Sequence, residues 1–196
     1  MKIIGVYKAE KSRTDDGLNI MVWPDSAMIR TGKPVFIPDG EYKSIIGLGA
    51  RITAVGKTIL PKFAHRYYED MVPVVFFLPT AAADKIAIGH DPEACDIVED
   101  YSVICGDPFV AERKEVTIQA QISSLLEDAD AGQTLNFKLD DIQDCIDQAI
   151  ASASKKNTLK TGDLVVRILR VWEKPTPDCI LKIKIDNTFL LENKLK

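Results

Sequence analysis

The first half of the chain alternates between short apolar runs and turn-forming residues. Apolar runs occupy residues 19–23, 35–37, 45–55 and 72–78, and Pro, Asp and Gly separate them, as in the turn at 38–40. Proline fixes φ and glycine adopts positive φ, so runs of this length between such residues are typical of strands and tight turns. Residues 62–70 predict a short helix that ends near Pro73.

The second half has a clearer periodicity. Apolar and polar residues alternate over 116–122, which predicts a half-buried strand. Over 139–153 the apolar residues recur at steps of three and four, which predicts an amphipathic helix. Aspartates near its start and Lys155 and Lys156 near its end suit the helix dipole. Further strands are predicted over 164–172, 180–185 and 189–195.

These elements predict one α+β domain that is mainly β. The 196 residues form a single domain, 1–196, with one long amphipathic helix and one or two short helices packed on strands. A chain of this length buries a sizeable core without a metal or disulfide staple.

Composition excludes several classes of function. The chain is 46% hydrophobic with a net charge of −4, which is too apolar for disorder and too acidic for a typical nucleic-acid binder. The apolar run at the N-terminus is too short for a secretory leader or for a membrane span of about 20 residues. Four dispersed cysteines predict reduced thiols and a cytoplasmic location.

Two histidines are candidates for chemistry. His90, with Asp91 and Glu93, could hold a metal ion, but no second cluster completes the ligand set, so a polar turn is the favoured interpretation. His65 could act as a general base beside Glu69, which lies one helical turn along. A histidine on the helix surface, or a hydrogen-bonded one in the core, is the more common case.

Arg167 and Arg170 are candidates for binding a small anion by direct charge. They lie three residues apart on a predicted strand, where alternate side chains point to opposite faces. We therefore expect one of them to be solvated surface.

Several segments, in the same order along the chain, resemble the fumarylacetoacetate hydrolase (FAH) superfamily. The early ones are residues 23–28 (Trp-Pro-Asp-Ser-Ala-Met), 32–34 (Gly-Lys-Pro) and 37–39 (Ile-Pro-Asp). The later ones are the predicted helix, the Leu-x-x-Gly-Asp turn at 159–163, and the alternating residues 180–195. The resemblance implies a mostly-β roll of several sheets with peripheral helices, commonly a dimer.

The resemblance also implies a metal-dependent enzyme that acts on small 2-oxo or 1,3-dioxo carboxylates, such as acylpyruvates. Mg²⁺ or Mn²⁺ would polarise the substrate's oxygens. The family holds this metal with a Glu-x-Glu pair on one strand and an Asp on a later strand, and alternate positions on a strand face the same side.

This chain lacks those ligands, because Glu-x-Glu occurs nowhere in it. The two glutamate positions correspond to Ile45 and Gly47, and the later aspartate corresponds best to Phe76. Trp23 stands at the position of the family's substrate lysine, and residues 167–170, beginning with Arg167, replace its Thr-Gly-Thr-Pro. No histidine precedes residue 23 to activate water.

Two hypotheses follow for the protein's function. The first is a non-catalytic FAH-like protein with no cofactor, which binds or interacts, as a homodimer or with an active relative, and takes a small anionic ligand. The second is a divergent hydrolase or decarboxylase that recruits Mg²⁺ or Mn²⁺ through His90, Asp91 or Glu93. If side chains fill the space between Trp23, Ile45, Gly47, Phe76 and Arg167, we expect no active site there, and if it is open and polar, we expect it to bind a ligand. Neither hypothesis involves a nucleic acid or a membrane.

Overall fold

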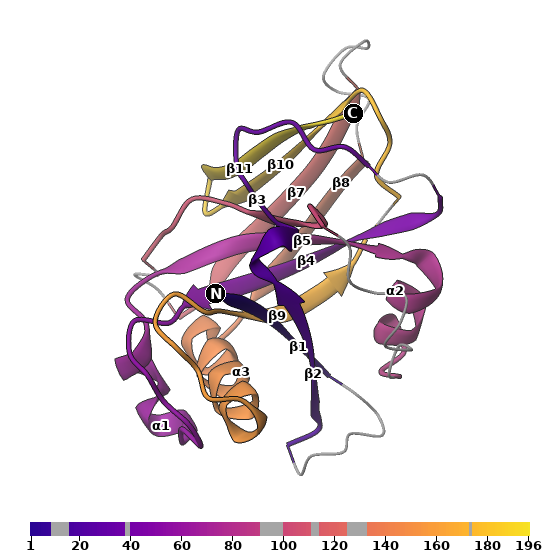
Figure 1. Cartoon of the computed structure of the whole chain (residues 1–196). Helices are drawn as coiled ribbons and strands as arrows, with labels where there is room; N and C mark the ends of the chain where they lie inside the picture. The colour runs from indigo at the N-terminus through magenta and orange to yellow at the C-terminus, as the bar shows by residue number, and fades with distance from the viewer. Residues whose placement is uncertain (9–15, 38–39, 91–99, 111–113, 125–132, 173) are drawn as a thin grey trace.

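The computed structural model describes residues 1–8, 16–37, 40–90, 100–110, 114–124, 133–172 and 174–196. Eleven strands are present in this part of the chain, with three α-helices and two short 3₁₀ helices (Figure 1). The strands are β1 (Lys2–Lys8), β2 (Leu18–Pro24), β3 (Met28–Arg30), β4 (Tyr42–Arg51), β5 (Met71–Pro79), β6 (Val103–Cys105), β7 (Val116–Ser124), β8 (Gln133–Leu139), β9 (Leu164–Val171), β10 (Cys179–Ile185) and β11 (Thr188–Leu195). The helices are η1 (Asp25–Ala27), α1 (Pro61–Ala64), η2 (His65–Tyr67), α2 (Thr80–Ala87) and α3 (Ile142–Lys156).

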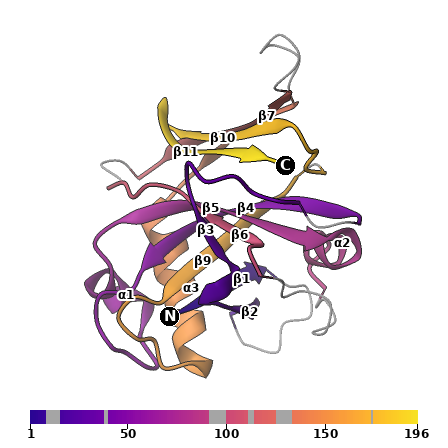
Figure 2. The ribbon, with the colours of Figure 1, turned by 45° about the horizontal axis from the view of Figure 1, so that its top comes forward.

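The strands form two sheets. Seven of them lie in the order β2-β1-β9-β4-β5-β6-β3, and the other four lie in the order β11-β10-β7-β8. The first strand, β1, is parallel to β9 and antiparallel to β2, so the large sheet joins both ends of the sequence. Figure 2 shows the four-stranded sheet stacked over β4 and β5.

The seven-stranded sheet is rolled up. Its two edge strands, β2 and β3, are consecutive in sequence and are joined only by the three residues of η1. A flat sheet would separate β2 from β5 by about 19 Å, because neighbouring strands lie about 4.8 Å apart. Instead, the rings of Trp23 on β2 and Phe76 on β5 have centroids 4.7 Å apart. The face that carries these two rings is therefore the concave inner face of the roll.

Each face of the large sheet has its own apolar core. On the outer face, the apolar stripe of α3 (Ile142, Ile146, Ala149, Ile150 and Ala153) and the inner face of the four-stranded sheet pack in one cluster. On the concave face, side chains of the rolled strands pack with one another and with α2. We call this second group the interior cluster; its members include Ile3, Tyr7, Trp23, Ile45, Val74, Phe76, Leu78, Ala83, Ile86, Val166 and Ile168.

The fold class predicted from the sequence is confirmed: the chain is mainly β, with one long amphipathic helix and two short ones. The strands predicted in the second half are β7, β9, β10 and β11. The long helix begins at Ile142 and not at residue 139, because Leu139 pairs with Val116 as the last residue of β8. The short helix expected over 62–70 is α1 followed by η2 and ends at Tyr67.

Other features differ from the sequence expectations. The patterns did not predict the strands β1, β3, β6 and β8 or the helix α2. Residues 35–37 form no strand but one bridge, from Val35 to Leu195.

In the described ranges, no helix combines the length and the apolar character that crossing a membrane requires.

Candidate functional site

Four of the five positions matched to the family site lie together on the concave face. Trp23, Ile45 and Phe76 are completely buried, and Ile45 is the register partner of Phe76 across β4 and β5. The Trp23 and Phe76 rings pack with an interplanar angle of 37°. Side chains thus fill the space that these positions surround.

Gly47 lies in the same packed region. A Cβ atom at this position would be 2.6 Å from Cγ1 of Val166 and 3.0 Å from the main-chain oxygen of Arg167. Gly5, on β1, is equally confined, because a Cβ there would be 2.7 Å from Cζ3 of Trp23. Both glycines are needed where a neighbour lies directly against the backbone, and neither position has room for the side chain of a metal ligand.

The residues of the interior do not fit the metal that the FAH resemblance implies. Mg²⁺ and Mn²⁺ prefer oxygen ligands, and Trp23, Ile45, Gly47 and Phe76 supply none from their side chains. The indole Nε1 of Trp23 is buried without a hydrogen-bond partner, but it is a donor and cannot ligate a cation. Over the whole described part of the chain, no three His, Cys, Asp or Glu side chains are grouped so that they could hold a metal ion.

The structure does not bring Arg167 to these four residues. Val166 and Ile168, its neighbours on β9, belong to the interior cluster, so Arg167 projects from the opposite face of the strand. Its guanidinium interacts with the thiol of Cys145 on α3. Burial raises the pKa of this thiol, and the positive charge of Arg167 partly offsets the rise. The Nη1 atom of Arg167 is buried and has no hydrogen-bond partner.

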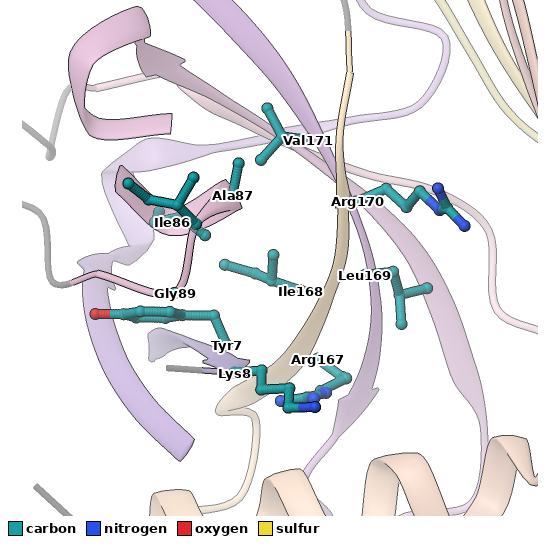
Figure 3. A pocket seen from close by; sticks show the side chains of 11 residues that line it. Tyr7, Lys8, Ile86, Ala87, Gly89, Arg167, Ile168, Leu169, Arg170 and Val171 are labelled. Atoms are coloured by element: carbon teal, nitrogen blue, oxygen red, sulfur yellow. The ribbon is translucent and has the colours of Figure 1, made fainter. Parts of the chain in front are cut away.

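Arg167 also lines a groove of about 790 Å³, which we call the strand-gap groove. It forms because β1 and β9 pair only from Ile3 opposite Leu164 to Val6 opposite Arg167, and then separate. The last two residues of β1 and the second half of β9 form its walls, and the end of α2 closes it (Figure 3). The lining residues are Tyr7, Lys8, Ile86, Ala87, Ile88, Gly89, Arg167, Ile168, Leu169, Arg170 and Val171.

The two arginines predicted from the sequence are in different environments. Arg170 is exposed, and its guanidinium lies 5.4 Å from the centroid of the Phe137 ring on β8. In Figure 3 Arg170 points away from Tyr7 and Ile86, whereas the side-chain ends of Arg167 and Lys8 lie in the same part of the view. Lys8 was not predicted as a site residue, and only its position directly after an apolar run could have indicated it.

His65 lines a second cavity, of about 340 Å³, together with Glu69. Glu69 lies beyond the end of η2, so the two do not share a helix. The Tyr68 hydroxyl, also at this cavity, donates a hydrogen bond of 3.0 Å to Asp147. Burial raises the pKa of Asp147, and the hydrogen bond from Tyr68 partly offsets this. The arrangement anchors α3 to the loop after η2.

His90 is exposed, and its backbone N–H donates a hydrogen bond to the carbonyl of Lys85 after the end of α2. Asp91 and Glu93, its proposed co-ligands, lie outside the described residues. The metal loop considered at residues 90–95 therefore stays a prediction.

A scan of the sequence against protein-family models gives no match, and a search of curated proteins gives no significant match. Solved structures do match. A fumarylpyruvate hydrolase from Pseudomonas aeruginosa, in complex with Mn²⁺ and pyruvate, is similar with a TM-score of 0.76 and 16% identity, over 100% of this chain and 89% of that chain. A Yersinia pestis CO92 protein assigned to the fumarylacetoacetate hydrolase family is similar with a TM-score of 0.76 and 16% identity, over 100% of this chain and 92% of that chain.

A 5-carboxymethyl-2-hydroxymuconate delta-isomerase from Mycobacterium smegmatis is similar with a TM-score of 0.73 and 16% identity, over 99% of this chain and 78% of that chain. At such identities the likeness shows the fold. The chain thus has the fold of FAH-family proteins, as the sequence resemblance predicted, and hydrolases and isomerases both use that fold.

Proposed function

We propose that this chain is a non-catalytic protein built on the FAH fold, which binds a partner or ligand and does not transform it. The observation that carries the proposal is the packing of Trp23 against Phe76, both completely buried, on the concave face of the roll. The positions that correspond to metal ligands in the family are occupied by apolar residues and a tightly packed glycine.

The packing also opposes a temporary opening of this region. Removal of a large aromatic side chain from a core costs about 3–5 kcal/mol. Moving Trp23 and Phe76 aside together would cost a comparable amount and would still expose no oxygen ligand. A metal centre of the family type therefore has neither the space nor the donors it needs at this place.

The proposal is tested by titrating the full-length protein with Mg²⁺ and Mn²⁺, using calorimetry and thermal unfolding. The fumarylpyruvate hydrolase of Pseudomonas aeruginosa, whose structure contains Mn²⁺, is the positive control. A ligand at a hundredfold excess over its Kd stabilises a protein by about 2.7 kcal/mol. We expect this stabilisation for the control and none for this chain at sub-millimolar metal.

A parallel assay measures turnover of acylpyruvates and oxaloacetate with and without Mn²⁺. We expect no turnover above the background with free metal. Metal-dependent turnover would contradict the proposal and favour the divergent enzyme, and loss of that turnover in His90→Ala would assign it to the 90–95 segment.

We also propose that the chain functions as a homodimer, or pairs with an active relative, in the cytoplasm. Support for the pairing comes from the FAH resemblance, and support for the location comes from the dispersed cysteines. Sedimentation velocity over a range of concentrations tests self-association: a dimer mass supports the homodimer, and a monomer at all concentrations excludes it.

A further inference from the structure

We infer that the strand-gap groove is a binding site for a small organic carboxylate with an apolar body. Lys8 and Arg167 would hold the carboxylate, and the aliphatic wall of α2 and β9 would hold the rest of the molecule. The inference rests on the proposed function only in that the chain is taken to bind this ligand without changing it.

All charged side chains among the described residues that line the groove are positive. Three cationic side chains line it (Lys8, Arg167 and Arg170), and none of the described lining residues is acidic. Within the described part of the chain, no ion pair joins these three to a carboxylate. In a protein of net charge −4, a group of cations with no acid among the described residues that line the same groove is a site that attracts an anion.

Arg167 in particular forms no ion pair with a carboxylate of the residues that the structure describes. Its Nη1 atom is buried without an acceptor. Arg167 also interacts with the Cys145 thiol, but burial raises the pKa of that thiol, so the thiol carries little negative charge. Nη1 itself is closed to solvent, so an anion in the groove would meet the accessible part of the half-buried Arg167 side chain and neutralise its charge. Lys8 supplies a second positive charge to the groove from the end of β1, beyond the last residue of β1 that pairs with β9.

The remainder of the wall is apolar. Ile86, Ala87 and Ile88 contribute it from the end of α2, and Ile168 and Val171 contribute it from β9. Ile88 is 59% exposed, so its side chain is accessible to a ligand in the groove. Hydrogen bonds already satisfy the end of α2, from the Ile88 N–H to Asp84 and from the Gly89 N–H to Ile86.

The backbone adds a further recognition element. β9 pairs with β4 as far as Val171, but in the described residues it has no strand partner on its β1 side beyond Arg167. Main-chain groups at such an open edge can bind a carboxylate. The open stretch is only four residues long, from Ile168 to Val171, which favours a small ligand over an added peptide strand.

A set of matched probes tests the site by isothermal titration calorimetry. Octanoate carries both the charge and the apolar body, octanamide lacks the charge, acetate lacks the body, and inorganic phosphate carries charge alone. We expect octanoate to bind with a stoichiometry of one, and each of the other three to bind at least tenfold more weakly. Equal binding of octanamide, or several equivalents of octanoate, would overturn the inference.

Variants of the groove locate the binding. We expect Lys8→Met and Arg167→Met each to weaken octanoate binding at least tenfold, whereas Arg66→Met, at an exposed arginine that does not line the groove, stays within twofold of the wild type. Ala87→Trp leaves every charge in place but fills the groove from an exposed position on α2, and we expect it to abolish binding.

Far-UV circular dichroism checks that each variant is folded. If Arg167→Met unfolds, Lys8→Met and Ala87→Trp decide the question, because both change exposed side chains. Wild-type affinity in these two variants would place the octanoate elsewhere and overturn the assignment. A failure to bind octanoate leaves the metal and turnover experiments unaffected, so the two proposals fail separately.

Discussion

The interior of the roll and the strand-gap groove share strand β9 but are filled to different degrees. Val166 and Ile168 belong to the interior cluster, and Ile168 also lines the groove together with Arg167. In the interior, Trp23, Ile45 and Phe76 are completely buried and Gly47 is tightly packed, whereas the groove beside Lys8 and Arg167 is open. The interior is therefore structural core, and the open space lies at the edge of the same strand.

The largest expected effect comes from Trp23→Ala. Trp23 is completely buried against Phe76, so we expect the free energy of unfolding to fall by about 3–5 kcal/mol in urea denaturation. Phe36→Ala, at a phenylalanine that is 69% exposed, is the control and should change it by less than about 0.5 kcal/mol. If Trp23→Ala cost no more than the control, the interior would not be core.

A second prediction concerns Asp163, which fastens β1 to β9 at the end opposite the groove. Its carboxylate accepts hydrogen bonds from the backbone N–H groups of Lys2 (3.0 Å) and Lys160 (2.8 Å), and it pairs with Nζ of Lys2 at 2.8 Å. Burial alone would raise the pKa of Asp163, but these hydrogen bonds and the charge of Lys2 outweigh burial and lower it below its ordinary 3.8. We expect Asp163→Asn to lower the free energy of unfolding by about 2–3 kcal/mol at pH 7.

The pH dependence of that difference follows from the sign of the shift. A carboxyl group whose pKa is lowered by folding stabilises the protein above pH 3.8 and loses this effect as the pH falls through the folded pKa. Urea denaturation at a series of pH values should therefore show the wild type and Asp163→Asn converging below pH 3.8. A difference that stayed constant into acid would contradict the assignment to this carboxylate.

Gly47→Ala should have a smaller effect. The new Cβ would contact Cγ1 of Val166 and the main-chain oxygen of Arg167, and such overpacking costs about 1–2 kcal/mol. Val166→Ala removes one of the two contacts, so the double variant should be more stable than the sum of the single effects. Strict additivity in this double-mutant cycle would mean that the two positions do not share the packed interior.

The smallest effect is expected at Cys145. Burial raises the pKa of its thiol, and Arg167 counteracts this by stabilising the thiolate. Arg167→Met should therefore slow alkylation of Cys145 by iodoacetamide several-fold at pH 8, measured by mass spectrometry of the peptide that contains it. Arg170→Met is the control and should leave the rate unchanged; an equal slowing in both variants would exclude a local effect of Arg167.

The sequence allowed the fold to be predicted well where one rule dominates. The alternation over 116–122 and the steps of three and four over α3 each reflect one buried face. Both patterns therefore predicted the element that the structure contains, β7 and α3. The start of α3 was misplaced because Leu139 continues the apolar spacing of the helix while its backbone pairs with Val116. No periodicity distinguishes these two possibilities for a residue between two elements.

The candidate site was only partly accessible from the sequence. The family resemblance placed Trp23, Ile45, Gly47, Phe76 and Arg167 around one space, and the structure brings all of them except Arg167 together. The groove was not predictable, since Lys8 and Arg167 are 159 residues apart and line the same groove only because β1 is parallel to β9. That pairing is the kind of long-range contact that local patterns do not contain.

The pairing of β1 with β9 also has a consequence for synthesis on the ribosome. In the sheet, β1 lies between β2 and β9, and β4 lies between β9 and β5. Both β1 and β4 therefore lack one neighbouring strand until β9 has been synthesised. Until residue 171 has emerged, the nascent chain carries a hairpin and a separate group of strands with open edges between them. Such late, non-local pairing folds slowly and exposes edges to aggregation, so this chain is expected to acquire its protease resistance only after β9 has emerged from the ribosome.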